Sequence, residues 1–171
     1  MLAVGRGDLD AFERIVLRHQ AEAWRVAYRF TGDAAEAEDL AQDAFLKILD
    51  AAPRYNPTST FRTYFYRVLT RLCIDRRRKK RPSLADPFPN VPDTTPSPST
   101  QADRAERDAL VQAALNSLPA DYRMAVVLRY FEGLGGAETA EAMGRSVKAV
   151  ERLLSRAKSA LEPQLRHLLE S

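Results

Sequence analysis

Apolar positions in the first eighty residues recur every three or four residues, which is the spacing of helices that bury one face. The first apolar stripe stops after Phe30 at the sequence TGD, where Asp33 is suited to cap a following helix. That second helix is predicted from Ala34 to about Leu49. A loop, AAPRYNPTST, then leads to Thr60, which is suited to cap a third helix. The first half of the chain is therefore predicted to form three amphipathic helices.

The helical pattern resumes near Ala102, with one helix stopped by Pro119 and another within ADYRMAVVLRYFEGLG. The next segment, AETAEAMGRSVKAVERLLSRAKSAL, predicts a short helix, a turn at Gly144 and a longer helix from near Ser146. A short helix, a tight turn with glycine and a longer helix with basic outer positions are typical of a helix-turn-helix. Many helical hairpins share this spacing, so the pattern alone leaves a DNA-binding role open.

The segment between the two helical blocks, PSLADPFPNVPDTTPSPST, is rich in proline. Proline removes a backbone donor and restrains the residue before it, so this segment is predicted to be an extended linker. We therefore predict an all-α protein made of two small helical domains, residues 1–81 and 102–171, joined by a flexible linker of residues 82–101.

The composition, 45% hydrophobic and 29% charged over 171 residues, suits a soluble globular protein. No apolar run approaches the roughly 18 residues of a membrane helix, and the first residues lack the long apolar stretch of an export signal. Cys73 is the single cysteine and the chain has two histidines, so we expect no disulfide framework, metal or other cofactor. A cytoplasmic location is the simplest expectation.

Charge is divided unequally between the two blocks. Residues 1–81 hold 16 Lys and Arg against 11 Asp and Glu, whereas residues 82–171 hold 10 against 12. The first block is therefore the better candidate for contact with a polyanion.

The third predicted helix interleaves aromatic and basic residues in TFRTYFYRVLTRLCIDRRRKKR. Its apolar stripe leaves four side chains in outward or flanking positions: Arg62, Tyr66, Arg67 and Arg71. Aromatic rings stack on unpaired bases at about 1–3 kcal/mol per base and arginines bind phosphates, so this combination suits single-stranded nucleic acid. The basic run 76–81 exceeds what a helix dipole needs, which also favours a polyanion partner.

The second predicted helix carries an acidic outer face with Glu38, Asp39 and Asp43. On an isolated helix this face would be a solvated surface. Beside a helix that meets DNA it would repel phosphate, so it is better suited to a basic protein surface.

Five segments carry a family resemblance: GDLDAFERIVLRH, AEAEDLAQDAFLKIL, TFRTYFYRVLTRLCIDRRRK, LNSLPADYRMAVVLRYFEGL and AETAEAMGRSVKAVERLLSRAKSAL. In this order, around a proline-rich linker, they resemble group IV of the bacterial sigma-70 family, the extracytoplasmic-function (ECF) sigma factors. The two blocks resemble the second and fourth conserved regions of that family, with no folded third region between them.

The resemblance implies an alternative sigma factor, not an enzyme, that binds core RNA polymerase, directs it to specific promoters and helps to melt the minus-ten element. It implies a polymerase-binding surface at Asp39, Gln42, Asp43, Phe45 and Leu46. It implies minus-ten contacts at Tyr55, Asn56, Arg62, Tyr66, Arg67, Arg71, Arg76, Arg77 and Arg78. It implies minus-thirty-five contacts in duplex DNA at Arg145, Lys148, Arg152, Ser155, Arg156 and Lys158.

The resemblance also implies control by an anti-sigma factor, expected to be anchored in the membrane, that covers the polymerase-facing helix. The sequence departs from the family pattern at Tyr64, where many members have Trp, and at Arg71, where many have Asn. Glu151 stands where the recognition helix often has a basic residue. We therefore do not carry over the base contacts of those positions or a particular minus-thirty-five specificity.

Two other classes of protein remain open from the residues. A helix-turn-helix regulator would explain the second block and would bind duplex DNA as a dimer without polymerase. A helical adaptor that binds only proteins would leave the interleaved aromatic and basic residues unexplained. An enzyme is disfavoured because the sequence shows no glycine-rich phosphate loop, paired-histidine metal motif or nucleophile–base set.

Overall fold

The computed structural model describes residues 1–80 and 100–169, except for the side chains of residues 100–104, 165 and 167–169. Residues 82–99 of the predicted linker lie outside the described residues. The described residues contain helices and no strand, which confirms the predicted all-α class. In chain order the elements are η1 (Val4–Arg6), α1 (Leu9–Thr31), α2 (Ala34–Ala51), η2 (Ala52–Arg54), α3 (Phe61–Lys80), α4 (Thr100–Ser117), α5 (Ala120–Val126), η3 (Val127–Phe131), α6 (Gly136–Met143) and α7 (Val147–Leu169).

Local capping signals set the boundaries of the first three long helices. Asp33 accepts a hydrogen bond from the backbone N–H of Glu36 at 2.9 Å and so caps α2. Thr60 accepts one from the N–H of Thr63 at 3.2 Å at the start of α3. Gly32 ends α1 with a left-handed φ of 73°, a conformation that favours glycine. The caps predicted at Asp33 and Thr60 are confirmed.

The first domain packs α2 and α3 against α1, and its core is built from large side chains that are almost fully buried: Phe30, Leu40, Ile48, Phe65 and Leu69. Phe45 packs its ring 6.0 Å from that of Phe65, between centroids, and belongs to the same cluster. Burial of such side chains stabilises the fold by about 1.5–3 kcal/mol each.

The second domain holds the predicted helix-turn-helix. A turn at Gly144, whose φ is 62°, joins the short helix α6 to the long helix α7. Val150 and Ala157 on α7 are buried, as are Ala140 and Ala142 on α6, and α7 also packs on α5. The short helix, the turn at Gly144 and a longer helix that begins next to Ser146 are those the sequence predicts.

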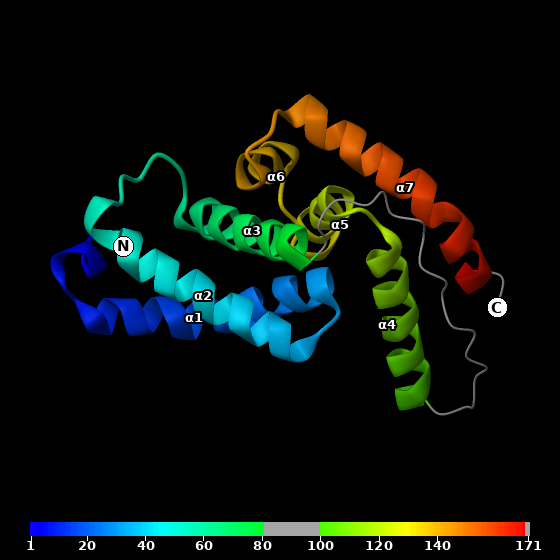
Figure 1. Ribbon diagram of the computed structural model, residues 1–171, viewed down its shortest axis with the longest axis horizontal. Helices are drawn as coiled ribbons and strands as arrows, with labels where there is room; N and C mark the ends of the chain where they lie inside the picture. The colour runs from blue at the N-terminus through cyan, green and yellow to red at the C-terminus, as the bar shows by residue number, and fades with distance from the viewer. Residues whose placement is uncertain (81–99, 170–171) are drawn as a thin grey trace.

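The two domains lie directly against each other, as Figure 1 shows, with α3 beside α5 and α6. Helix α1 also contacts α4, α5 and η3, and the buried side chains of both domains form one continuous cluster. This contact connects residues far apart in the chain and was not predicted from the sequence.

Polar contacts cross the same interface. Arg123 on α5 is fully buried, and its Nη1 donates to the carbonyl of Phe30 at the end of α1. Gln112 on α4 donates to the carbonyl of Arg29 at 3.0 Å. The guanidinium of Arg29 in turn lies 4.0 Å from the ring centre of Phe131. The end of α1 is therefore held by the second domain at three places.

Candidate nucleic-acid interface

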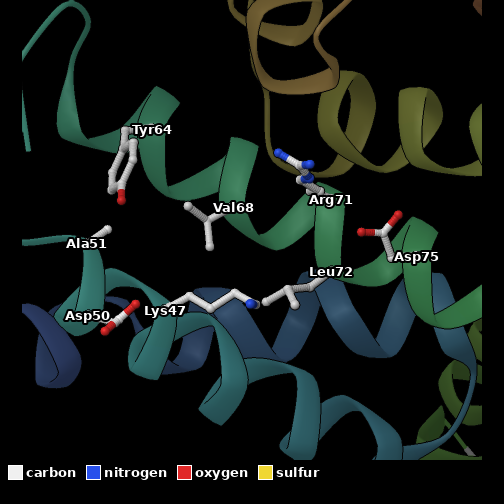
Figure 2. A pocket seen from close by; sticks show the side chains of 8 residues that line it. All are labelled: Lys47, Asp50, Ala51, Tyr64, Val68, Arg71, Leu72 and Asp75. Atoms are coloured by element: carbon white, nitrogen blue, oxygen red, sulfur yellow. The ribbon is translucent and has the colours of Figure 1, made fainter. Parts of the chain in front are cut away.

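Helix α3 presents two different faces, and one of them lines an open groove against α2. The groove has a volume of about 440 Å³ and is lined by Lys47, Asp50, Ala51, Tyr64, Val68, Arg71, Leu72 and Asp75. Figure 2 shows Tyr64, Val68 and Leu72 on α3 facing the groove, with Lys47 and Asp50 across it. The groove combines an aromatic ring and aliphatic side chains with two cations, Lys47 and Arg71, and two carboxylates, Asp50 and Asp75. The ring and the cations are groups that an unpaired nucleotide can use.

The aromatic end of this groove is a small cluster. Tyr55 from the loop packs edge-on against Tyr64 with ring centres 5.0 Å apart, and Arg67 lies 5.7 Å from the Tyr64 ring centre. Burial and the neighbouring Tyr55 raise the pKa of the Tyr64 phenol, so it stays a neutral hydrogen-bond donor. Asn56, Arg67 and Arg71 are exposed. The structure thus brings Tyr55, Arg67 and Arg71 of the predicted site together.

Tyr66 is a correction to the prediction, which placed it in an outward or flanking position. Its side chain is fully buried, in a pocket between the two domains. The phenol donates to Glu22 on α1 and lies 3.1 Å from Oε2 of Glu132 in the second domain. Burial, the hydrogen bond to Glu22 and the charges of both carboxylates raise the pKa of the phenol far above its ordinary value. In this arrangement Tyr66 cannot stack on a base.

Arg62 lies beside Tyr66 and is shared between the domains. Its Nη2 donates to the main-chain carbonyl of Glu132 at 2.8 Å, and its Nε lies 3.6 Å from Glu22. The side chain keeps 45% of its exposure. The predicted minus-ten residues therefore divide into an open group around Tyr64 and a group covered by the second domain.

The basic end of α3 is partly occupied by the acidic face of α2. Arg76 lies 3.2 Å from a carboxylate oxygen of Asp43, and Lys80 lies 2.9 Å from Glu36. Arg77 also has an interaction partner, and Arg78 is exposed. The structure therefore joins Arg76, predicted to contact DNA, to Asp43, predicted to contact polymerase.

The predicted polymerase-binding face is largely exposed. Asp39 and Gln42 face outward on α2, and Leu46 is 62% exposed. Phe45 is the exception, because it is 7% exposed and lies in the core. Its side chain is therefore not part of the exposed surface, and a polymerase contact there stays a prediction.

The second domain exposes every position predicted to face duplex DNA: Arg145 in the turn before the recognition helix, and Lys148, Arg152, Ser155, Arg156 and Lys158 on α7. Arg145 forms an ion pair with Asp121, and Nη1 of Arg156 donates to the hydroxyl of Tyr122 at 3.4 Å. Both partners lie on α5, so they orient the basic side chains near the start and middle of α7. The second domain does not cover its own candidate DNA surface.

Sequence reasoning missed the residues that hold the two domains together: Glu22, Arg25, Arg123 and Glu132. Glu132 lies in the pocket with a 3% exposed side chain, and Nη2 of Arg25 lies 3.3 Å from its Oε2. One sequence signal points to Glu132: it is a carboxylate at the end of the apolar stretch AVVLRYFEGL. A buried acid there needs hydrogen-bond donors from elsewhere in the fold.

No metal or membrane feature accompanies these surfaces in the parts of the chain that the structure describes. Across residues 1–80 and 100–169, no group of three or more potential ligand side chains could hold a metal ion. None of the helices described here has both the length and the apolar character that a membrane crossing requires.

Comparison with known proteins matches both domains. The family model for sigma-70 region 2 matches residues 15–82, and the model for sigma-70 region 4 matches residues 108–161. The ECF RNA polymerase sigma factor SigW of Bacillus subtilis is 34% identical, covering 96% of this chain and 94% of SigW. The RNA polymerase sigma-H factor of Pseudomonas aeruginosa is 33% identical, covering 97% of this chain and 92% of the relative. SigE of Mycolicibacterium smegmatis is 31% identical, and the match spans 62% of its length.

Solved structures show the same arrangement of helices. CnrH, in complex with the cytosolic domain of CnrY, matches with a TM-score of 0.73 at 27% identity, covering 96% of this chain and 94% of CnrH. The sigma factor RpoE of Bartonella quintana, in complex with the anti-sigma factor NepR, matches with a TM-score of 0.66 at 21% identity, covering 91% of this chain and 97% of RpoE. The second of these supports the fold alone. With both conserved regions matched and full-length relatives above 30% identity, the chain belongs to the extracytoplasmic-function (ECF) sigma factors of the sigma-70 family.

Proposed function

We propose that this protein is an alternative sigma factor that binds core RNA polymerase, directs it to specific promoters and helps to melt the minus-ten element. The observation that carries this proposal is the pairing of two surfaces in one chain. The second domain exposes a basic recognition helix, and the first carries a groove with the ring of Tyr64 and the cations Lys47 and Arg71. Duplex recognition and strand opening need these two kinds of surface.

The groove on α3 is proposed to hold the opened non-template strand. Its cations would neutralise phosphates and the ring of Tyr64 would face a base, with Tyr55, Asn56, Arg67 and Arg71 around it. Arg62 and Tyr66 join this surface only when the second domain moves away, because both now contact Glu132. Arg77 and Arg78 extend the basic surface toward the end of the helix, and Arg76 joins it on leaving Asp43.

The recognition helix is proposed to read the minus-thirty-five element in the major groove. Lys148, Arg152, Ser155 and Arg156 would face the bases, while Arg145 and Lys158 suit phosphates. An arginine that binds guanine with two hydrogen bonds discriminates against other bases by about 1–3 kcal/mol. Phosphate contacts add affinity that falls as salt rises.

The exposed face of α2 is proposed to dock on a basic surface of core polymerase. Asp39, Gln42 and Asp43 would supply polar contacts, and Leu46 an apolar one. Phe45 would support this face from below, since it packs in the core. Because the proposed work is stacking and electrostatic stabilisation of opened strands, no covalent catalysis by this chain is needed.

An anti-sigma factor is proposed to control the protein. The solved complexes of CnrH with CnrY and of RpoE with NepR each contain a relative in fold bound to another protein, and NepR is named as an anti-sigma factor. We extend this to a partner that covers the α2 face of this chain and is anchored in the membrane, with the sigma factor in the cytoplasm. Pull-down from cells under inducing and non-inducing conditions would contradict this if core polymerase were the only partner in both.

Run-off transcription with purified core polymerase on fragmented genomic DNA tests the proposed function. We expect new transcripts that start at a shared pair of promoter elements and that require this protein. Arg67→Ala and Arg71→Ala should reduce open-complex formation more than initial binding, and Arg152→Ala should reduce initial binding. Arg14→Ala, at an exposed position of α1, serves as the charge-matched control. Footprints on duplex DNA without polymerase, and no new transcripts, would instead indicate a helix-turn-helix regulator.

A further inference from the structure

Glu132 extends from the second domain into a pocket of basic and phenolic groups on the first. Its Oε2 lies 3.3 Å from Nη2 of Arg25 and 3.1 Å from the hydroxyl of Tyr66. Its main-chain carbonyl accepts from Nη2 of Arg62 at 2.8 Å. The carboxylate thus occupies a site built by α1 and α3.

The carboxylate of Glu132 makes its hydrogen bonds with the other domain and not with its own. Both hydrogen-bond partners of its carboxylate, Arg25 and Tyr66, belong to the first domain, whereas its backbone N–H donates to the carbonyl of Val127. The second domain therefore uses the backbone of this residue for its own fold and the carboxylate for contact with the first domain.

The carboxylate is buried but incompletely satisfied. Among the described residues its Oε1 has no hydrogen-bond partner. Its Oε2 shares the single O–H of Tyr66 with Glu22, and one proton cannot fully serve two acceptors. A buried acceptor without a partner favours any arrangement that releases it to water or exchanges it for a better ligand.

The charges show what the pocket would accept once Glu132 leaves. With Glu132 in place, two guanidinium groups, Arg25 and Arg62, face two carboxylates, Glu22 and Glu132. Without Glu132, and with His19 counted as neutral, Arg25, Arg62 and Glu22 give the pocket a net charge of one positive. A phosphate oxygen has the charge and the acceptor geometry to replace the carboxylate.

We propose that Arg25, Arg62 and Tyr66 form a backbone-phosphate site for single-stranded DNA and that Glu132 occupies this site in the free protein as an intramolecular competitor. The proposal rests on the DNA-binding role proposed for α3 and adds to it Arg25, on α1, and an autoinhibitory carboxylate from the second domain. A ligand that needs a partly populated open state binds more weakly in proportion to that population.

Three proteins test the competition: the wild type, Glu132→Gln and Glu132→Ala. Binding of a fluorescein-labelled single-stranded DNA 20-mer of mixed sequence is measured by anisotropy without polymerase. We expect both variants to bind roughly tenfold more tightly than the wild type, by release of the competitor. Glu141→Gln, which removes an exposed carboxylate on α6, is the control and should not change affinity.

The new phosphate contact is tested by adding Arg25→Ala to the Glu132→Ala protein. The gain in affinity should be lost, and the slope of log affinity against log salt should fall by about one. Domain separation is measured independently, as the distance between spin labels at Glu13→Cys on α1 and Ser159→Cys on α7; both positions are exposed, and the buried Cys73 should stay unlabelled. The Glu132 variants should show a larger population of long distances.

Three results would overturn the inference. Unchanged distances and unchanged affinity would show that Glu132 does not hold the site. Longer distances without tighter binding, or a gain that survives Arg25→Ala, would show that no phosphate takes its place. Run-off transcription with the same proteins separates these results from failure of the proposed function, because a wild type that initiates at promoters keeps that function whatever Glu132 does.

Discussion

The fold leaves one of the two candidate DNA surfaces exposed and covers part of the other. Helix α7 and the turn before it expose their basic positions, with Arg145 in the turn and Arg156 on the helix oriented by partners on α5. On helix α3 the groove side is open, whereas Tyr66 is fully buried against the second domain and Arg62, 45% exposed, is held by a hydrogen bond to Glu132. A surface for duplex DNA is thus open in the arrangement described, and part of the surface for opened strands is closed.

This difference has a simple physical origin. The basic side chains of α7 lie on a helix whose apolar side is satisfied inside its own domain, by contacts with α5 and α6. Tyr66 and Arg62 instead lie where α3 meets α1 and the second domain. Tyr66 is buried in the cluster that both domains share, and Arg62 donates to the main chain of Glu132. The same helix can therefore hold one exposed and one covered set of aromatic and basic residues.

The largest expected effect comes from breaking the closed arrangement at Arg123. Arg123→Met removes donors to the carbonyls of Phe30, Asn116 and Leu118 within a buried interface. We expect a loss of about 2–4 kcal/mol in the free energy of unfolding, measured in urea. Arg107→Met, at an exposed position of α4, should cost far less. Equal losses in the two variants would show that the buried guanidinium does not hold the interface.

A second test adds one methyl group at the interface. A Cβ at Gly32 would lie 2.7 Å from Nδ2 of Asn116, whose side-chain oxygen is held by Gln112 and Arg123. Gly7 also has a positive φ but open space around it, so Gly7→Ala measures backbone strain alone, at about 1–2 kcal/mol. We expect Gly32→Ala to cost a further ~1–3 kcal/mol in thermal unfolding from overpacking. Equal losses of stability in Gly32→Ala and Gly7→Ala would show that the contact between Gly32 and Asn116 is not tightly packed.

A smaller effect is expected for Tyr66→Phe, which keeps the ring and removes the hydroxyl that donates to Glu22. Burial alone would raise the pKa of Glu22, but the hydrogen bonds from Tyr66 and His19 and the nearby positive charges outweigh it, so the pKa lies below its usual value. We expect Tyr66→Phe to lose about 1–2 kcal/mol of unfolding free energy at pH 7.

The pH dependence of this loss checks its cause. A carboxyl with a lowered pKa in the folded state stabilises the protein above its unfolded pKa, about 4.3, and this contribution disappears as pH falls through the folded value. The difference in stability between wild type and Tyr66→Phe should therefore shrink below about pH 4. A difference that is constant from pH 7 to pH 3 would mean that the hydroxyl does not act through Glu22.

The smallest effect concerns the pair between Arg76 and Asp43, which is partly exposed. A double-mutant cycle with Arg76→Ala and Asp43→Asn should give a coupling of at most about 1 kcal/mol, falling further as salt rises. A larger coupling that resists salt would indicate that the pair fixes α3 against α2 and leaves Arg76 unsuited to DNA.

The parts of this structure that could be predicted from sequence are those set by neighbouring residues. Asp33, Thr60 and Gly144 act on the turn in which they lie, so the helices and the helix-turn-helix follow from local signals. Phe45 lies in the core with the apolar stripe of α2, so its assignment to the polymerase surface rests on the family resemblance alone.

The rest depends on contacts between distant parts of the chain. Periodicity identifies which side of α3 is apolar, but it cannot show that Glu132, 66 residues away, covers Tyr66. The sequence around Arg123 also does not indicate that its side chain is buried or which carbonyls it contacts. The contact of Arg62 and Tyr66 with the second domain is therefore a tertiary property; the sequence offers a carboxylate after an apolar stretch at Glu132 but does not indicate what that carboxylate contacts.

The most direct test of the account compares the distance between spin labels at positions 13 and 159 in the free protein and in its complex with core polymerase on an active promoter. We predict one short distance in the free protein, because α1 and the second domain are in contact. In the complex the distance should lengthen, since Arg62 and Tyr66 must be uncovered to meet the opened strand. An unchanged short distance in a complex that produces transcripts would contradict the account.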